Sequence, residues 1–331
     1  MIKRLAVLLA LILLLAAALA GCGERPSQEQ LPEGNGAKPG DEAQADDEEY
    51  ISISVSDLKK YISDSSSVME LAQRFFTDTI VYKDAAGQYK FEPVNKTLPL
   101  SDYNWDNLRN LSITGKEFVY EEDGQVRSIK GIDVSRYQSD IDWEKVAGDG
   151  VEFVMVRVGY RGYLEGKIVL DEKFEEHVEG ALRHGIKVGV YFVTQALTEE
   201  EAVEEANFVL DAIAPFNISW PVVLDIEEAA STTARTVGLS AQKRTDNAIA
   251  FCETVKQAGY TPMLYCNIRW YMDELELDRL PAYEKWFAQY FNRPFFPYDF
   301  GMWQYTNTGR VNGISGNVDL NISMKDYSKK E

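Results

Sequence analysis

The stretch WPVVLDIEE, from Trp220 to Glu228, decides how this chain folds. Its apolar residues run without interruption into Asp225, Ile226 and Glu227. A short continuous apolar run of this kind predicts a strand that is buried on both faces, which is typical of a parallel sheet. Because residues i and i+2 of a strand point to the same side, Asp225 and Glu227 should project together, with their Cα atoms roughly 6–7 Å apart.

Two carboxylates at the polar end of a buried strand cost folding free energy unless something pairs or uses them. One interpretation of Asp225 and Glu227 is therefore an acidic strand end that meets solvent or an arginine. The other is a catalytic pair. Paired carboxylates at this spacing suit the cleavage of a glycosidic bond, because one can act as the acid while the other steadies positive charge on the sugar.

From Gly131 onward, short apolar segments alternate with longer amphipathic ones. This alternation predicts an α/β fold, an irregular (β/α) barrel whose last strands follow each other without clear helices. The predicted helices are Trp143–Ala147, Glu172–His184, Glu199–Ile213 and Ala241–Ala258. The predicted strands are Gly131–Ser135, Phe153–Gly159, Lys187–Val193, Pro221–Glu227, Pro262–Cys266, Lys285–Tyr290, Met302–Thr306 and Asn317–Asn321.

Polar residues recur at the ends of these predicted strands, where barrels of this type carry their reactive groups. The first and last strands become neighbours when a barrel closes. Asp133 and Asp319 should therefore lie close to each other and face Asp225 and Glu227 across the mouth. Aromatic rings near the mouth could stack on a sugar, with packing as the alternative for each ring. The candidate substrate-binding residues are Tyr191, Trp286, Tyr290, Trp303, Gln304 and Tyr305.

The first residues resemble a bacterial lipoprotein signal. Lys3 and Arg4 precede an apolar stretch, Leu5 to Ala20, which is short for a membrane span of about 20 residues. The stretch leads into Leu-Ala-Gly-Cys, so we expect residues 1–21 to be removed and Cys22 to carry lipid. The chain would then be anchored at the extracellular face of the bacterial cell membrane. An ordinary signal peptide or membrane anchor that happens to contain a cysteine is the alternative.

Two further regions precede the predicted barrel, which we place at residues 131–327. Residues 22–49 are expected to form a flexible tether, because nine acidic residues stand there against two basic ones and large apolar residues are almost absent. Residues 50–130 predict a helix over Val55–Phe76 and two hairpins, around Asp84–Gly87 and Asp123–Gly124. This region is either a small α+β subdomain or an elaboration of the main domain.

The formal net charge of −19 over 331 residues argues against binding to the phosphates of nucleic acid. Cys252 and Cys266 are best interpreted as small buried hydrophobes, although a single disulfide between them stays open. His177 and His184 lie seven apart on one predicted helix and are interpreted as surface residues. No histidine falls at a strand end, so we expect neither a metal nor another cofactor. We also expect a monomer.

Taken together, several segments resemble the lysozymes of glycoside hydrolase family 25. GIDVSRYQSDIDW, from Gly131 to Trp143, is similar to the opening signature of that family. FVMVRVGYRG, KVGVYFV, VVLDIEE, GYTPMLYCN, KWFAQY, MWQYT and GISGNVDLN then follow in the family's order. The resemblance implies an irregular β/α barrel. It also implies an N-acetylmuramidase that cleaves between N-acetylmuramic acid and N-acetylglucosamine in peptidoglycan.

The same resemblance implies roles for the four carboxylates. Glu227 resembles the general acid and Asp225 its partner carboxylate, while Asp133 and Asp319 resemble the two acids that complete the site. This chain departs from the family pattern in two places, which leave specificity open. Ser139 stands where the opening signature usually has Gly, and a Gly-Tyr-Arg-Gly run from Gly159 replaces a Thr/Ser-Glu-Gly run.

Three other interpretations compete with this one. A barrel hydrolase of another family, such as a family 18 chitinase, would carry several Asp residues where this chain has Val222 to Leu224. A metal-dependent hydrolase would need histidine ligands at strand ends. The main alternative is a non-catalytic lipoprotein that binds peptidoglycan through a lysozyme-like fold, although the presence of all four carboxylates argues against it.

Overall fold

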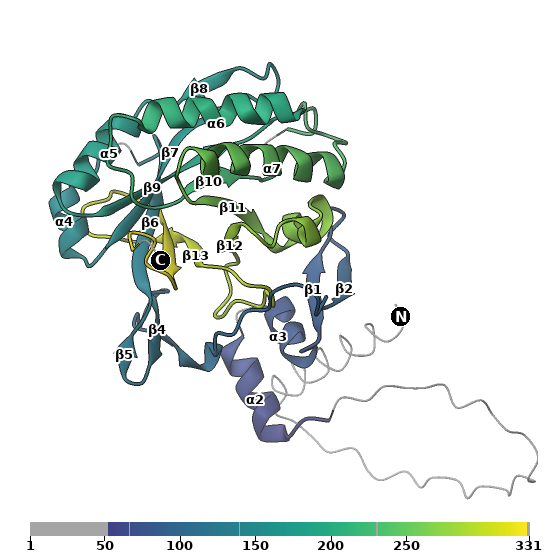
Figure 1. The fold of residues 1–331 in the computed structure, drawn as a ribbon. Helices are drawn as coiled ribbons and strands as arrows, with labels where there is room; N and C mark the ends of the chain where they lie inside the picture. Colours follow the sequence, from purple (N-terminus) through teal and green to yellow (C-terminus); the bar gives the residue numbers. More distant parts are fainter. Residues whose placement is uncertain (1–51, 66, 139, 230, 330–331) are drawn as a thin grey trace, which may run out of the picture. The chain divides into compact units, whose positions relative to one another are not determined.

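The structure is a computed structural model that describes residues 52–329, apart from 66, 139 and 230 (Figure 1). The predicted signal segment, Cys22, the acidic tether and Ser139 lie outside the described residues. Within the described part of the chain, no helix combines the length and the apolar character that crossing a membrane would require.

A closed barrel of eight strands forms the centre of the described chain (Figure 1). Neighbouring strands follow the order of the sequence, and the last strand pairs with the first. The predicted barrel is therefore confirmed, with one addition, because a short strand, β8 (Ile168–Leu170), extends the sheet beside the end of β7. The barrel strands are β6 (Ile129–Val134), β7 (Phe153–Arg161), β9 (Lys187–Val193), β10 (Val222–Asp225), β11 (Pro262–Asn267), β12 (Glu284–Ala288), β13 (Met302–Gly309) and β14 (Val318–Ser323).

The last strand differs from the expectation in its direction. All neighbouring barrel strands are parallel except β14, which runs antiparallel to both β13 and β6. The mouth therefore meets the N-terminal end of β14 and not its C-terminal end. Asp319, the second residue of β14, is the direct Cα partner of Asp133 on β6. The predicted closeness of these two residues is confirmed, but through an antiparallel pair.

Strand β10 is shorter than predicted. It ends at Asp225, and Glu227 lies two residues beyond it. The pair is therefore divided between a regular strand and the connection that follows it. This places Asp225 under the constraint of the sheet, whereas Glu227 sits on a segment with more backbone freedom.

Four helices cover the outside of the first two thirds of the barrel (Figure 1). Local signals explain the start of α6, because Thr198 accepts a hydrogen bond from the backbone N–H of Glu201 and the Glu201 carboxylate accepts one from Leu197. After β11 the connections contain only short helical turns, η2 (Trp270–Glu274) and η3 (Leu277–Arg279). The four helices are α4 (Trp143–Gly148), α5 (Phe174–Arg183), α6 (Glu199–Ile213) and α7 (Ala241–Gln257).

Two apolar layers hold the barrel together, one inside it and one between the sheet and its cover. In the inner layer the Phe153 ring stacks on Trp220 with centroids 4.1 Å apart. Gly131 on β6 makes room for this layer, because a Cβ there would lie 2.2 Å from the Phe153 ring. The inner layer consists of Phe153, Met155, Trp220, Val223, Met263, Trp286 and Met302.

The region before the barrel forms two helices and two hairpins. The single helix predicted over Val55–Phe76 is wrong, because Ser65 and Ser67 have extended backbone conformations and Ser67 starts a second helix by accepting from the N–H of Glu70. Both predicted hairpins are confirmed. The elements are α2 (Val55–Asp64), α3 (Val68–Phe75), β1 (Thr79–Lys83), β2 (Tyr89–Pro93), η1 (Trp105–Asn107), β3 (Leu108–Asn110), β4 (Phe118–Glu122) and β5 (Gln125–Val126).

Residues 52–130 share a hydrophobic core with the barrel. The Phe118 ring stacks on Trp303 of β13 with centroids 5.4 Å apart, and the Trp105 ring stacks on Phe300 at 5.5 Å. These contacts lie on the part of the barrel that has no covering α-helix of its own. The region thus supplies the apolar cover that helices provide for the earlier strands.

Candidate active site

A cavity of about 110 Å³ opens at the mouth of the barrel. All four predicted catalytic carboxylates line it, together with three of the six predicted substrate-binding residues. The structure therefore brings together side chains that are separated by up to 186 positions in the sequence, from Asp133 to Asp319 (319 − 133). The lining residues are Asp133, Tyr191, Asp225, Glu227, Tyr265, Trp286, Gln304 and Asp319.

Asp133 is buried and held in one orientation by two amides. Its Oδ2 accepts hydrogen bonds from Gln304 Nε2 at 2.9 Å and from Asn321 Nδ2 at 2.8 Å. Asn321 is fixed in turn because its Oδ1 accepts a bond of 2.8 Å from the indole N–H of Trp286. Burial raises the pKa of Asp133, while the two amide donors and Asp319 act against that rise.

Asp319 and Asp133 share one proton at neutral pH. Burial, and then the charge of Asp133 and a hydrogen bond to it, raise the pKa of Asp319 to about 9. Asp319 is therefore protonated and donates to the Asp133 carboxylate. Two adjacent carboxylates commonly behave in this way, because the second ionisation would place like charges side by side.

Asp225 is buried, and its Oδ1 has no hydrogen-bond partner among the described residues. Burial raises its pKa well above the usual range, and the charges of Glu227 and Asp133 add to this, while Arg157 opposes it. A buried carboxylate oxygen without a partner costs free energy unless a ligand satisfies it. Asp225 is thus poised to interact with a molecule that enters the cavity.

Glu227 combines solvent access with a raised pKa. Its side chain is exposed, but it lines both the mouth cavity and a second cavity of about 20 Å³. Loss of surrounding water and then the charge of Asp133 raise its pKa, again against Arg157. A carboxyl group that keeps its proton longer than usual and remains reachable from solvent meets the two requirements of a general acid.

Two contributors to this site were not predicted from the sequence. Arg157 follows Phe153 and Met155 on the inward face of β7, and its guanidinium bonds to Asp171 at 2.6 and 2.7 Å. The hydroxyl of Tyr265 donates to Gln304 Oε1 at 2.8 Å. An arginine in the middle of an apolar run was a signal for the first, since such a run buries charge only where the charge is paired or used. Tyr265 gave no comparable signal.

The six predicted substrate-binding residues divide into two groups. Tyr191, Trp286 and Gln304 line the cavity, and Tyr290 is 41% exposed while its hydroxyl donates to Gln304. Trp303 and Tyr305 are not brought to the cavity. They are fully buried and pack on Phe118, because alternate residues of β13 point to opposite faces of the sheet. For these two residues the structure favours packing.

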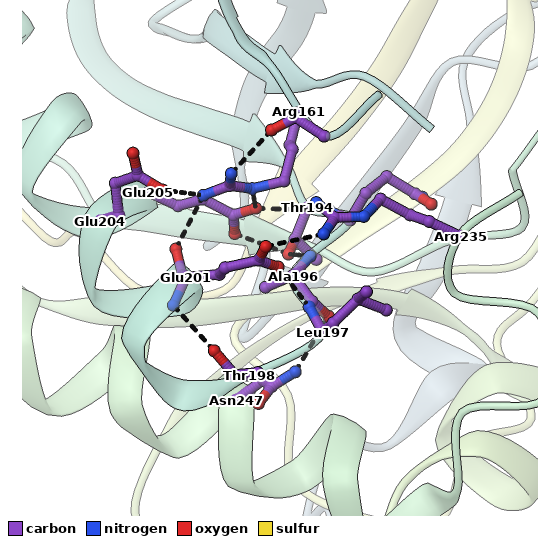
Figure 2. Close-up of polar contacts among 12 residues, drawn as sticks. Arg161, Thr194, Ala196, Leu197, Thr198, Glu201, Glu204, Glu205, Arg235 and Asn247 are labelled. Atoms are coloured by element: carbon purple, nitrogen blue, oxygen red, sulfur yellow. Dashed lines mark hydrogen bonds and ion pairs between the residues drawn. The ribbon is translucent and has the colours of Figure 1, made fainter. Parts of the chain in front are cut away.

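A cluster of ion pairs supports one wall of the site (Figure 2). Arg161, at the end of β7, donates to Glu205 at 2.7 Å and to Glu204 at 2.8 Å, both on α6. Glu205 also accepts from the hydroxyl of Thr194 at 2.6 Å, and the N–H of Thr194 donates to the carbonyl of Asp225. The cluster thus fixes the connection after β9 against the end of β10, next to Glu227.

The remaining candidate residues have structural surroundings. His177 is buried, not on the surface as predicted, because its ring contacts the carbonyl of Ser135 at 3.3 Å and the Trp143 ring at 6.0 Å. Cys252 and Cys266 are free and buried, which confirms their interpretation as small hydrophobes. Between residues 52 and 329, as far as they are described, no three His, Cys, Asp or Glu side chains are grouped to hold a metal ion.

The chain is similar to one described family and to several named proteins. The model of the family described as "Glycosyl hydrolases family 25" matches residues 132–314, which is more than half of the chain. YegX of Escherichia coli K12 is 29% identical over 199 residues, which cover 59% of this chain and 69% of YegX. The autolytic lysozyme of Clostridium acetobutylicum is 27% identical over 195 residues, covering 58% of this chain and 55% of that protein.

Among solved structures, the modular autolysin LytC of Streptococcus pneumoniae, in complex with a synthetic peptidoglycan ligand, is similar with a TM-score of 0.54. The two chains are 26% identical, and the similarity covers 74% of this chain and 56% of LytC. This chain thus spans only part of the length of the autolysins that it matches. In this chain the structural similarity to LytC extends beyond residues 132–314, because it covers 74% of the chain and the family model covers a smaller share.

Proposed function

The chain belongs to glycosyl hydrolase family 25, and from this membership we propose that it is a lysozyme. It would hydrolyse the bond between N-acetylmuramic acid and N-acetylglucosamine in the glycan strands of peptidoglycan. The observation that carries the proposal is the cavity at the barrel mouth, where four carboxylates with raised pKa values meet. An autolytic lysozyme among its relatives, and the peptidoglycan ligand in the LytC structure, support this choice of substrate.

In the first step Glu227 donates its proton to the glycosidic oxygen. The bond between that oxygen and C1 of the muramic sugar breaks, and the N-acetylglucosamine end leaves as an alcohol. Positive charge then develops at C1. Asp133 assists this step, because its charge favours the protonated form of Glu227 before the bond breaks.

Asp225 stabilises the positive charge in one of two ways. Its unpartnered Oδ1 can attack C1 directly and form a covalent ester, or it can accept the N–H of the sugar's acetamido group while the acetamido oxygen attacks. In both routes Glu227, now deprotonated, removes a proton from the water that completes the hydrolysis. Both routes retain the configuration at C1.

The test is an analysis of products from purified protein incubated with peptidoglycan. The digest is reduced with borohydride, which converts each new reducing end into a sugar alcohol. Muramitol is the expected product. Glucosaminitol would instead indicate a glucosaminidase on the same scaffold. If the folded protein released no reducing ends but still bound peptidoglycan, the non-catalytic wall-binding function would replace the proposal.

We also propose that the chain acts as a lipid-anchored monomer at the extracellular face of the bacterial membrane. The support is the sequence Leu-Ala-Gly-Cys that ends the first apolar stretch. A Cys22→Ser variant should lose labelling by a radioactive fatty acid and should keep its N-terminal segment. Undiminished labelling of that variant would contradict the anchor.

A further inference from the structure

Two arginines and two tyrosines form a cluster at the ends of β6 and β7. The guanidinium carbon of Arg136 lies 5.4 Å from the centre of the Tyr137 ring and 5.7 Å from that of Tyr160. The guanidinium carbon of Arg157 lies 5.3 and 5.7 Å from the same two rings. Each cation therefore contacts both rings, an arrangement that restricts the guanidinium planes and stabilises their charge.

The cluster lies at the mouth of the barrel. Arg157 is the Cα partner of Tyr191, which lines the mouth cavity, and its charge lowers the pKa values of Asp225 and Glu227. Arg136 stands three residues after Asp133.

The turn that carries Arg136 is anchored on two sides. Its backbone N–H donates to Asp171 at 3.2 Å, while Gln138 donates to the carbonyl of Asn317, two residues before Asp319. The position of this turn after β6 is therefore defined by the fold.

The two arginines differ in one respect. Arg157 is neutralised by Asp171, which is buried and bonds to its guanidinium at 2.6 and 2.7 Å. For Arg136, no carboxylate of the described chain lies within ion-pair distance, and its side chain is half-buried. A positioned guanidinium without an acidic partner is notable in a chain of net charge −19, because acidic side chains are abundant.

We propose that Arg136 is a specificity residue that binds a carboxylate on the peptide stem of the substrate. This inference rests on the proposed function. The glycan backbone itself offers no charge to a guanidinium, but the peptide carried by each muramic sugar does. A planar guanidinium binds a carboxylate through two parallel hydrogen bonds, and Tyr137 and Tyr160 hold that plane in place.

The charge of Arg136 also bears on how an anionic peptide stem can approach the mouth. A stem carboxylate that approached the mouth would meet the charge of Asp133, which raises the pKa values of Asp225, Glu227 and Asp319 and which repels another anion. A guanidinium without an acidic partner, such as that of Arg136, would offset this repulsion for a carboxylate bound beside it. Arg136 and Tyr137 belong to the segment that resembles the family's opening signature, whereas Tyr160 belongs to the Gly-Tyr-Arg-Gly run in which this chain departs from the family pattern.

The test compares two synthetic peptidoglycan tetrasaccharides that differ only in their stems, which carry free carboxylates in one and primary amides in the other. The full-length protein should have a lower KM for the free acid, by about tenfold, which is the range of one well-placed charged hydrogen-bond pair. Arg136→Gln should raise the KM for the free acid to that of the amide and leave kcat unchanged. Arg136→Lys should keep part of the preference. Arg127→Gln is the control, because Arg127 is exposed on the β5 hairpin and has no ion pair in the described chain.

Several outcomes would overturn the assignment. Equal KM values of the wild-type protein for the two substrates would remove the preference, whether or not a variant folds. A rise in KM on both substrates in a folded Arg136→Gln protein would show a structural role. If the wild-type protein were folded but cleaved neither tetrasaccharide nor peptidoglycan, the proposed function itself would fail, which is distinct from cleavage without preference.

Discussion

Two groups of acidic side chains in the barrel domain have opposite surroundings, because one group is bonded to guanidinium groups and the other is not. Glu201, Glu204 and Glu205 are each bonded to a guanidinium, Glu201 to that of Arg235 and the other two to that of Arg161 (Figure 2). At the mouth, Asp133, Asp225, Glu227 and Asp319 line one cavity. The cation that lowers the pKa values of Asp225 and Glu227, Arg157, is already bonded to Asp171.

The difference separates acids that hold the fold from acids that are available for chemistry. In a buried carboxylate with a bonded cation, the charge and the hydrogen-bonding capacity are already used within the protein, so they are not available to a ligand. Burial raises pKa values in both groups, to about 7 for Glu205, but the carboxylates that face each other without a bonded cation also keep lone pairs free, as Asp225 Oδ1 does. The fold is destabilised by the second group, and the first group helps to offset that cost.

The largest expected effect comes from removing the Arg161 guanidinium from the ion-paired acids. Arg161→Met removes the cation from Glu205, which is fully buried, and removes donors to the carbonyls of Gly166 and Glu201. Leaving one partner of a buried ion pair uncompensated should lower the free energy of unfolding by about 3–5 kcal/mol. Urea denaturation measures this, with Arg127→Met as the exposed control. A loss below about 1 kcal/mol would show that the pairing does not stabilise the fold.

The next effect concerns activity and not stability. Glu227→Gln removes the proton donor but keeps the size of the side chain, so turnover on peptidoglycan should fall at least about 10²-fold. The thermal midpoint should not fall, because an isosteric neutral group replaces a crowded acid. Glu228→Gln is the matched control, since Glu228 is the next residue and forms only an exposed ion pair with Arg269. Near-normal turnover in a folded Glu227→Gln protein would reject the assigned role.

A smaller effect is expected for Asp319→Asn, which keeps a hydrogen-bond donor toward Asp133 but removes a titrating group. Activity should fall about tenfold without loss of stability, because the like-charge contact is relieved. Asp278→Asn, at an exposed site, serves as the control. Full activity of the Asp319→Asn protein would show that this residue only supports the structure.

The sign of the pH dependence follows from the raised pKa of Asp319. The folded protein holds a proton that the unfolded chain releases near pH 4, so the associated stability is fully present below that pH and is lost as the pH rises through about 9. The Asp319→Asn protein should therefore show a flatter decline of stability with pH over this range. Urea midpoints at several pH values measure the slope, and an unchanged slope would contradict the shared proton.

The smallest expected effect concerns Glu205, which belongs to the ion-paired group. Burial raises the pKa of Glu205 to about 7, although Thr194 and Arg161 lower it. Its protonation therefore stabilises the fold fully below about pH 4.5, and this contribution is lost as the pH rises through 7. Glu205→Gln should remove that decline and change the free energy of unfolding by about 1 kcal/mol, less at pH 5 than at pH 8. A variant with the wild-type slope would exclude Glu205 as its source.

The sequence by itself determined the strands, the barrel and the carboxylate pair at the end of β10. These are properties of local patterns, because apolar runs, turn residues and the spacing of Asp225 and Glu227 act within a few residues. Closure followed from topology alone, since the first and last of eight strands must meet. The order of the strands alone therefore places Asp133 and Asp319 together.

Only the tertiary structure decided what each side chain faces. Trp303, Gln304 and Tyr305 are equally suited to a sugar site by residue type, but the pleat of β13 sends only Gln304 inward. The reversal of β14 and the cover that residues 52–130 provide depend on contacts between distant segments. Ion pairing cannot be predicted from a local sequence pattern either. Whether a carboxylate contacts a guanidinium depends on where another strand or helix places that arginine.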